Sequence, residues 1–216
     1  MISSRPLLAA LCICAATPVA AHPHVFVDAT VEVLTEAGAV TGLRLVWTYD
    51  DLFSLMLTED LGIDADGDLV LTDAEAAELA ASVTDWPADY TGDLVVSNGG
   101  SSLTLAPRDD HGAAFAGGRV IEVHRRPLVT PASAIAGPVT VEVFDPYYYV
   151  AYTVTGVTVT GDPSCEATLV RADLEAAQAE VDATWEGLDW ASAAPDVQLP
   201  AIGEAFSDRV EVRCGG

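Results

Sequence analysis

The sequence predicts a mainly β protein: an antiparallel β-sandwich with an inserted EF-hand-like helix-loop-helix and one further C-terminal helix. Three observations lead to this fold class. Apolar and polar residues alternate over most segments, Gly and Pro separate these segments at short intervals, and only three stretches have helical spacing. Short antiparallel strands connected in this way are typical of two packed sheets.

The expected strands begin directly after an apolar leader. In the first of them, every second residue is apolar, which predicts one buried face: Val25, Val27, Ala29, Val31 and Val33. The turn Ala37-Gly38 separates it from a second strand. This second strand covers Val40–Trp47. The other expected strands are Asp93–Ser97, Ser102–Ala106, Arg119–Arg125, Val139–Phe144, Val150–Thr160 and Arg209–Cys214.

Two of the expected helices are close together in the sequence. The first covers Tyr49–Leu61 with Thr48 or Asp50 as its N-cap, and the second covers Asp73–Asp85. With their connection they form an insertion at residues 49–86. The third helix, Asp173–Trp185, carries one apolar stripe made of Leu174, Ala177, Val181 and Trp185.

The connection between the first two helices has the spacing of a calcium loop. It reads DADGDLVLTDAE, from Asp64 to Glu75. An EF-hand takes oxygen ligands from loop positions 1, 3, 5, 7, 9 and 12, which here are Asp64, Asp66, Asp68, the Val70 carbonyl, Thr72 and Glu75. Position 6, normally Gly, is Leu69, where a left-handed backbone costs about 1 kcal/mol. The segment is therefore either a weak Ca²⁺ site or a solvated acidic turn.

Residues 1–21 have the pattern of a secretory signal peptide. Arg5 precedes an apolar run from Leu7 to Ala16, and Val19 and Ala21 form a small-residue cleavage site. Cleavage after Ala21 would leave residues 22–216 as one β-sandwich domain in the periplasm, with no segment long enough for membrane insertion. Two cysteines would remain, Cys165 and Cys214, and in an exported protein they are expected to form a disulfide.

The mature chain would then begin with His22, followed by Pro23 and His24. The terminal amine and neutral imidazoles are good ligands for transition metals, namely Ni, Co, Zn or Cu. Pro23 lacks the amide proton that a square-planar amino-terminal site requires, so the ion would need ligands from elsewhere in the fold. Glu122 and His124, two residues apart on an expected strand, are candidates, although an isolated histidine is more often an ordinary surface residue. The same holds for His111 in its polar loop.

Charge and motifs exclude several functions. The formal net charge is −24 and there is no lysine, so the surface repels nucleic acid and anionic lipid. The chain has no nucleophile elbow and no Gly-rich phosphate loop, and neither expected mature cysteine lies in a Cys-x-x-Cys motif. We therefore expect a protein that is not an enzyme and has no nucleic-acid partner.

Five segments occur in an order that resembles a known family: HPHVFVD, LVWTYDDLFS, DADGD, FDPYYYVAY and AFSDRVEVRC. The chain is similar to family 1007 of the domains of unknown function, exported bacterial proteins described as the periplasmic component of an uncharacterised ABC-type transport system. The resemblance implies a periplasmic accessory role beside nickel or cobalt transporters, with an inner-membrane metal permease as the partner.

The sequence thus favours a periplasmic metal-binding accessory protein of a transition-metal transport system. Two alternatives remain. One is a calcium-stabilised interaction module that has no role with transition metals. The other is a copper enzyme built on the N-terminal histidine, since periplasmic copper carriers and copper monooxygenases also begin at a histidine.

Overall fold

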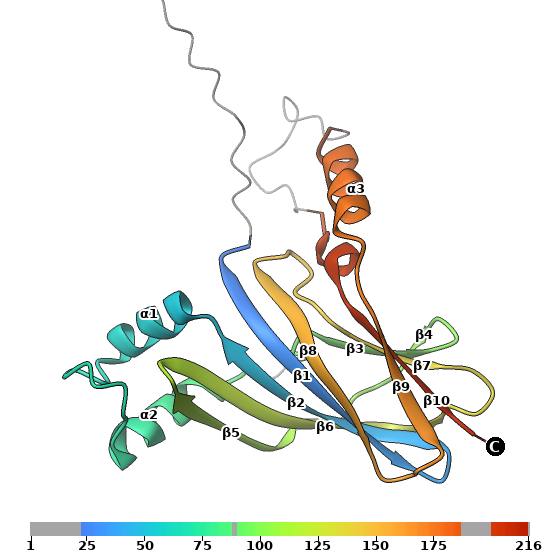
Figure 1. The fold of residues 1–216 in the computed structure, drawn as a ribbon, viewed down its shortest axis with the longest axis horizontal. Coiled ribbons are helices and arrows are strands. Elements are labelled where there is room, and N and C mark those ends of the chain that lie inside the picture. The colour runs from blue at the N-terminus through green and yellow to red at the C-terminus, as the bar shows by residue number, and fades with distance from the viewer. Residues whose placement is uncertain (1–22, 88–89, 187–199, 216) are drawn as a thin grey trace, which may run out of the picture.

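The computed structural model describes residues 23–87, 90–186 and 200–215, and these form two five-stranded sheets (Figure 1). The first sheet has the order β5-β6-β2-β1-β8 and the second the order β4-β3-β7-β10-β9. The strands of the first sheet are β1 (Val25–Glu36), β2 (Ala39–Tyr49), β5 (Asp109–Ala116), β6 (Arg119–Ser133) and β8 (Val150–Thr160). Those of the second are β3 (Leu94–Asn98), β4 (Ser101–Ser102), β7 (Val139–Val143), β9 (Cys165–Val170) and β10 (Arg209–Cys214).

The predicted mainly β, two-sheet fold is confirmed, with one exception to the antiparallel pairing. β1 and β8 run parallel, with Val25 beside Val150, whereas the other strand pairs are antiparallel. A parallel pair cannot be joined by a tight hairpin and needs a long connection. Here all the strands from β2 to β7 lie between β1 and β8 in the sequence, and the chain enters β8 from β7 in the other sheet.

The core lies between the two sheets and uses the apolar positions that alternation predicts. The predicted face of β1 is buried throughout, and it packs with the inner faces of β2, β7 and β10. Cys165 and Cys214 are directly paired across β9 and β10 and form the predicted disulfide.

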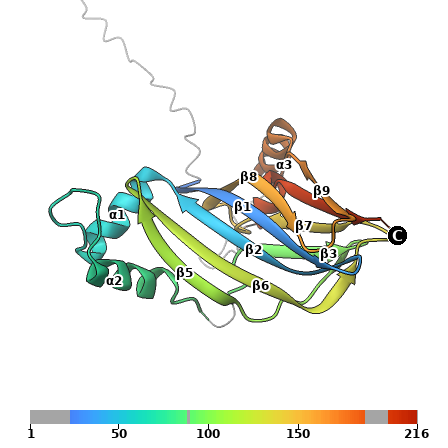
Figure 2. The same cartoon turned by 60° about the horizontal axis from the view of Figure 1, so that its bottom comes forward.

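Three helices accompany the sheets: α1 (Asp51–Leu61), α2 (Asp73–Val83) and α3 (Leu174–Glu186), together with the short 3₁₀ helix η1 (Gly203–Phe206). α1 and α2 lie at the β5 end of the first sheet (Figure 2). They enclose a second, smaller core formed by Ile63, Leu79 and Val120. No helix in the described ranges is long and apolar enough to cross a membrane.

Several predicted boundaries were wrong. Tyr49 ends β2 instead of opening α1. Of the two predicted N-caps, Asp50 is confirmed: its carboxylate accepts from the Phe53 amide at 2.9 Å. The strand expected over 102–106 shrinks to β4 and an isolated bridge at Leu105. Two strands were missed: β5, because its Gly and Ala residues have low strand propensity, and β9, Cys165–Val170, which was not recognised.

Candidate functional site

Three consecutive alternate residues of β6, all of them polar, face into the protein. Glu122, His124 and Arg126 alternate with Ile121, Val123 and Arg125, and the exposed fractions of the first three are 1%, 0% and 6%. The sequence showed their shared face but did not show that it points inward, and a surface position for His124 is therefore wrong. Val120 and Leu128 occupy the same face on either side, and they anchor it in the small and the large core respectively.

Glu122 is held by a cationic and a neutral donor. The Tyr49 hydroxyl donates to Glu122 Oε2 at 3.3 Å, and Arg108 Nη1 donates to Oε1 at 3.4 Å. Burial raises the pKa of Glu122 to about 7, although Tyr49 and Arg108 both act in the opposite direction. This carboxyl group therefore exchanges its proton near neutral pH.

His124 lies beside this carboxylate, with its Nδ1 3.9 Å from Glu122 Oε1. Neither ring nitrogen has a hydrogen-bond partner among the described protein atoms. Burial, followed by the charges of Arg126 and Arg108, lowers the pKa of His124 to about 3, so the imidazole is neutral at physiological pH. A neutral imidazole with a free ring nitrogen is the form that binds metals.

Aromatic rings surround His124 on two sides. Its ring meets Trp47 edge-on at a centroid distance of 4.6 Å and Trp86 at 4.8 Å. Trp86 also carries the Arg108 guanidinium 4.0 Å above its ring, and it comes from the connection between α2 and β3. The polar pair is thus closed in by residues from three separate segments of the chain.

A second polar pair completes this region. The Tyr152 hydroxyl donates to Asp93 at 2.8 Å, and burial raises the pKa values of both groups. Tyr152 also contacts Trp47, at a centroid distance of 5.2 Å. Alternation on β2 and β8 could have placed Trp47 and Tyr152 on an inner face, but no sequence signal linked Trp86, Asp93 or Arg108 to the site.

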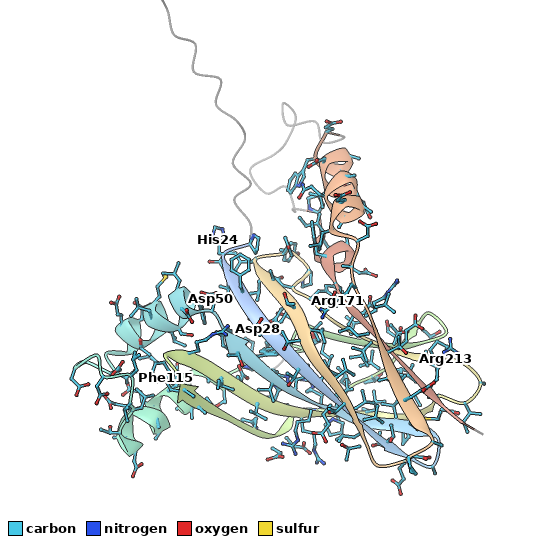
Figure 3. The ribbon with its side chains drawn as sticks, in the orientation of Figure 1. His24, Asp28, Asp50, Phe115, Arg171 and Arg213 are labelled. Atoms are coloured by element: carbon cyan, nitrogen blue, oxygen red, sulfur yellow. A yellow bond between two sulfur atoms is a disulfide. The ribbon has the colours of Figure 1, made fainter. Side chains whose placement is uncertain are left out.

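The structure does not bring His24 to this pair. His24 precedes β1 at an exposed end of the first sheet, where its ring lies 4.8 Å from the Tyr149 ring (Figure 3). His124 pairs with Leu45, which pairs with Val31, seven residues further along β1. At about 3.3 Å per residue this is roughly 23 Å along the strand, too far for one ion to bind both.

His22 lies outside the described residues, as does the predicted signal peptide. His111 is exposed on β5.

The donor set fits a transition metal with one constraint. A bound ion lies about 2.0–2.2 Å from nitrogen and carboxylate oxygen ligands, so Glu122 and His124 would have to approach by less than an ångström from 3.9 Å. Arg108 is the constraint, because its charge already compensates Glu122. A cation at this pair competes with Arg108 for the carboxylate.

The acidic loop between α1 and α2 forms a cluster of its own. Ligand oxygens of Asp64, Asp66 and Asp68 lie within 4.8 Å of one another. Leu69 has φ +62°, the left-handed conformation, and its amide donates to Asp64 Oδ1 at 3.1 Å. Val70 and Thr72 are exposed.

Glu75 is engaged at both of its oxygens. Oε2 accepts from the Thr72 amide and hydroxyl, each at 2.8 Å, and Oε1 accepts from the Asp64 amide at 3.0 Å. These bonds lower the pKa of Glu75 and form a capping box that starts α2. Glu75 therefore has a structural role whether or not it meets an ion.

The fold and the site together define a two-sheet β protein with a buried ionisable pair between its sheet and its helical end. The family model described as "Protein of unknown function (DUF1007)" matches residues 7–214, and the chain belongs to this family. No curated protein matches the sequence closely enough to be reported as a relative.

Proposed function

We propose that this protein binds a transition-metal ion in the cell envelope and serves a metal transporter there, without being an enzyme itself. The observation that carries the proposal is His124. It is fully buried, neither ring nitrogen has a hydrogen-bond partner in the described part of the chain, and the Glu122 carboxyl group lies beside it. Buried polar atoms are nearly always satisfied, so this histidine is prepared to bind something.

Periplasmic location and partnership with an inner-membrane permease for nickel or cobalt belong to this proposal. The disulfide between Cys165 and Cys214 supports an oxidising compartment. The resemblance described above supports the transporter, with zinc and copper as other candidate ions. His22 and His24 would form a separate, exposed site, from which an ion could be received.

The test is a titration of the chain beginning at His22 with Ni(II), Co(II), Zn(II) and Cu(II), free of competing chelators. Glu122→Gln and His124→Gln should each weaken binding at the buried site by more than about 10- to 100-fold, the cost of losing a residue that only orients a ligand, because each removes a direct ligand. Arg108→Gln should tighten it, because a competing cation is removed. The combined change His22→Ala, His24→Ala should remove only the exposed site.

His111→Ala is the control histidine, because His111 is exposed and makes no ion pair with another described residue. Its charge contributes to lowering the pKa of His124, but only after burial and the two arginines, so this change should alter the affinities far less than His124→Gln does. Titrations that none of the substitutions at positions 22, 24, 122 and 124 alters would contradict the proposal, provided that circular dichroism shows folded variants.

A second candidate function rests on the cluster of Asp64, Asp66 and Asp68. In this reading the loop binds Ca²⁺ and stabilises an interaction module. Calcium should then raise the melting temperature of a chain that lacks all four of the histidine and glutamate ligands named above.

A further inference from the structure

Arg126 is a buried cation with no counter-ion. Its side chain is 6% exposed, and it makes no ion pair with any described residue. Its Nε has no hydrogen-bond acceptor there either. Arginine is almost never fully buried unless it is paired. In a chain as acidic as this one, an arginine that pairs with none of the acidic residues the structure describes marks a place where an anion is expected from outside.

A cavity of about 380 Å³ opens beside this arginine, within the size range of small-molecule sites. Its lining combines two guanidinium groups with aromatic and aliphatic surface: Arg108, Arg126, Trp86, Tyr90, Leu105 and Pro107. These residues come from β6 and from the connections before β3 and β5. The cavity is therefore built from segments distant in sequence.

The two arginines differ in what they already bind. Arg108 donates to Glu122 and to the Thr84 carbonyl, and its guanidinium covers the Trp86 ring. Arg126 has no such contacts, and burial together with the nearby Arg108 charge lowers its pKa. Arg126 is thus the group with hydrogen-bond donors to spare, while Arg108 adds to the positive potential.

We propose that this cavity binds a small organic carboxylate, with the carboxylate on Arg126 and the apolar body against Trp86 and Leu105. A planar guanidinium matches a carboxylate with two parallel hydrogen bonds. A single charge suits the site better than a phosphate dianion does, because only one arginine is uncommitted. The remaining lining is suited to a flat or aliphatic body. This site shares Trp86 and Arg108 with the surroundings of the metal site proposed above, but carboxylate binding here does not require the metal.

The experiment uses the metal-free chain, prepared on a chelating resin because soluble chelators are themselves carboxylates. Benzoate, hexanoate, inorganic phosphate and benzyl alcohol are titrated by calorimetry and by tryptophan fluorescence, since Trp86 lines the cavity. We expect saturable binding of the two carboxylates, a change in fluorescence, and no binding of benzyl alcohol, which lacks the charge.

Arg125 provides the matched control on the same strand. It neighbours Arg126, but it lies on the opposite face of β6 and pairs with Asp109 at 2.6 Å. Arg126→Gln should weaken carboxylate binding at least about tenfold, and Arg125→Gln should leave it unchanged. Arg126→Lys keeps the positive charge but loses the planar guanidinium that makes two parallel hydrogen bonds. Its carboxylate affinity should lie between those of the other two variants.

Several outcomes would overturn the inference: no saturable binding of either carboxylate, equal binding by the folded Arg126→Gln and Arg125→Gln variants, or phosphate binding tighter than the carboxylates. Should Arg126→Gln not fold, the comparison of Arg126→Lys with Arg125→Lys decides in the same way. Arg108→Gln separates the two proposals, because it should weaken the carboxylate while it tightens a metal at Glu122.

Discussion

Glu122 and His124 have opposite dependences on pH although their side chains touch. Burial disfavours the charged form of each, so it raises the pKa of the acid to about 7 and lowers that of the base to about 3. Over the range between these values both groups are neutral in the folded protein. With only one of the two groups, the free energy of unfolding would depend on pH over this range. With both, the two dependences oppose each other.

The stability of folding should show this opposition. In the unfolded chain the two groups titrate near their ordinary values of 4.5 and 6.5. The contribution of Glu122 is complete below pH 4.5 and is lost as the pH rises to about 7. That of His124 is complete above pH 6.5 and is lost as the pH falls to about 3. Between 4.5 and 6.5 the two slopes cancel.

Single substitutions should expose each slope in urea unfolding measured from pH 3 to 8. Relative to the native protein, Glu122→Gln should gain stability with rising pH between 4.5 and 7, by up to about 1.4 kcal/mol per pH unit. His124→Gln should lose stability relative to the native protein as the pH rises from 3 to 6.5. Subtracting the native curve of unfolding free energy against pH from that of each variant cancels the contributions of all other titrating groups. Flat differences for both variants would show that neither pKa is shifted.

At the scale of elements, α1 and α2 depend on one strained residue between them. Leu69 takes φ +62° and is about half exposed, so its side chain contributes little packing in return. A left-handed conformation costs a residue with a Cβ atom about 1–2 kcal/mol. Asp64 also has a positive φ, of 52°, but an Asp tolerates it better.

Leu69→Gly should therefore stabilise the protein without any ion, by up to about 1 kcal/mol after the greater entropy of the unfolded chain is counted. If the loop binds Ca²⁺, the same change should tighten binding from the ~10⁻⁴–10⁻³ M range of extracellular modules. At 2 mM calcium a tenfold excess over the dissociation constant gives roughly 1.4 kcal/mol, a melting shift of about 3–6 °C.

Leu71→Ala offers the contrast within the same loop, because Leu71 packs against the small core and its loss should destabilise. Melting curves with calcium and with a chelator measure all three proteins. A native protein indifferent to both conditions would leave the loop as an acidic turn, and a Leu69→Gly variant that melts earlier would show that Leu69 is not strained.

For the whole molecule the dominant property is its net charge of −24 over 216 residues. Such a charge repels itself in the compact state more than in the unfolded chain. Monovalent salt shortens the range of this repulsion, from about 10 Å at 0.1 M to about 3 Å at 1 M. The described ion pairs involving arginine are mostly on the surface, so screening them by salt removes little stabilising free energy.

The melting temperature should therefore rise by several degrees between 0.1 and 1 M sodium chloride, at about 2–4 °C per kcal/mol. Glu175→Gln with Glu180→Gln on the exposed face of α3 should reduce the salt dependence, because two charges are removed. Sucrose at equal osmolality is the control for exclusion effects. A melting temperature that falls with salt would mean that attractive pairs outweigh the repulsion.

The sequence by itself determined the two-sheet architecture, the buried face of β1, the disulfide and the family. Each of these follows from local information: the alternation of apolar residues, the count of cysteines after the predicted signal peptide, and motifs read in order. The pair Glu122 and His124 was also visible, since two residues apart on a strand means one shared face.

Only the tertiary structure decided which way that face points, because alternation separates two faces without saying which one is covered. The apolar Ile121 and Val123 lie on the opposite face, yet the packing of β2 and of the helical end encloses Glu122, His124 and Arg126. Trp86, Asp93 and Arg108 join them from distant connections. A site assembled from long-range contacts leaves no period in the sequence, and so the cavity and its unpaired arginine emerged only from the folded chain.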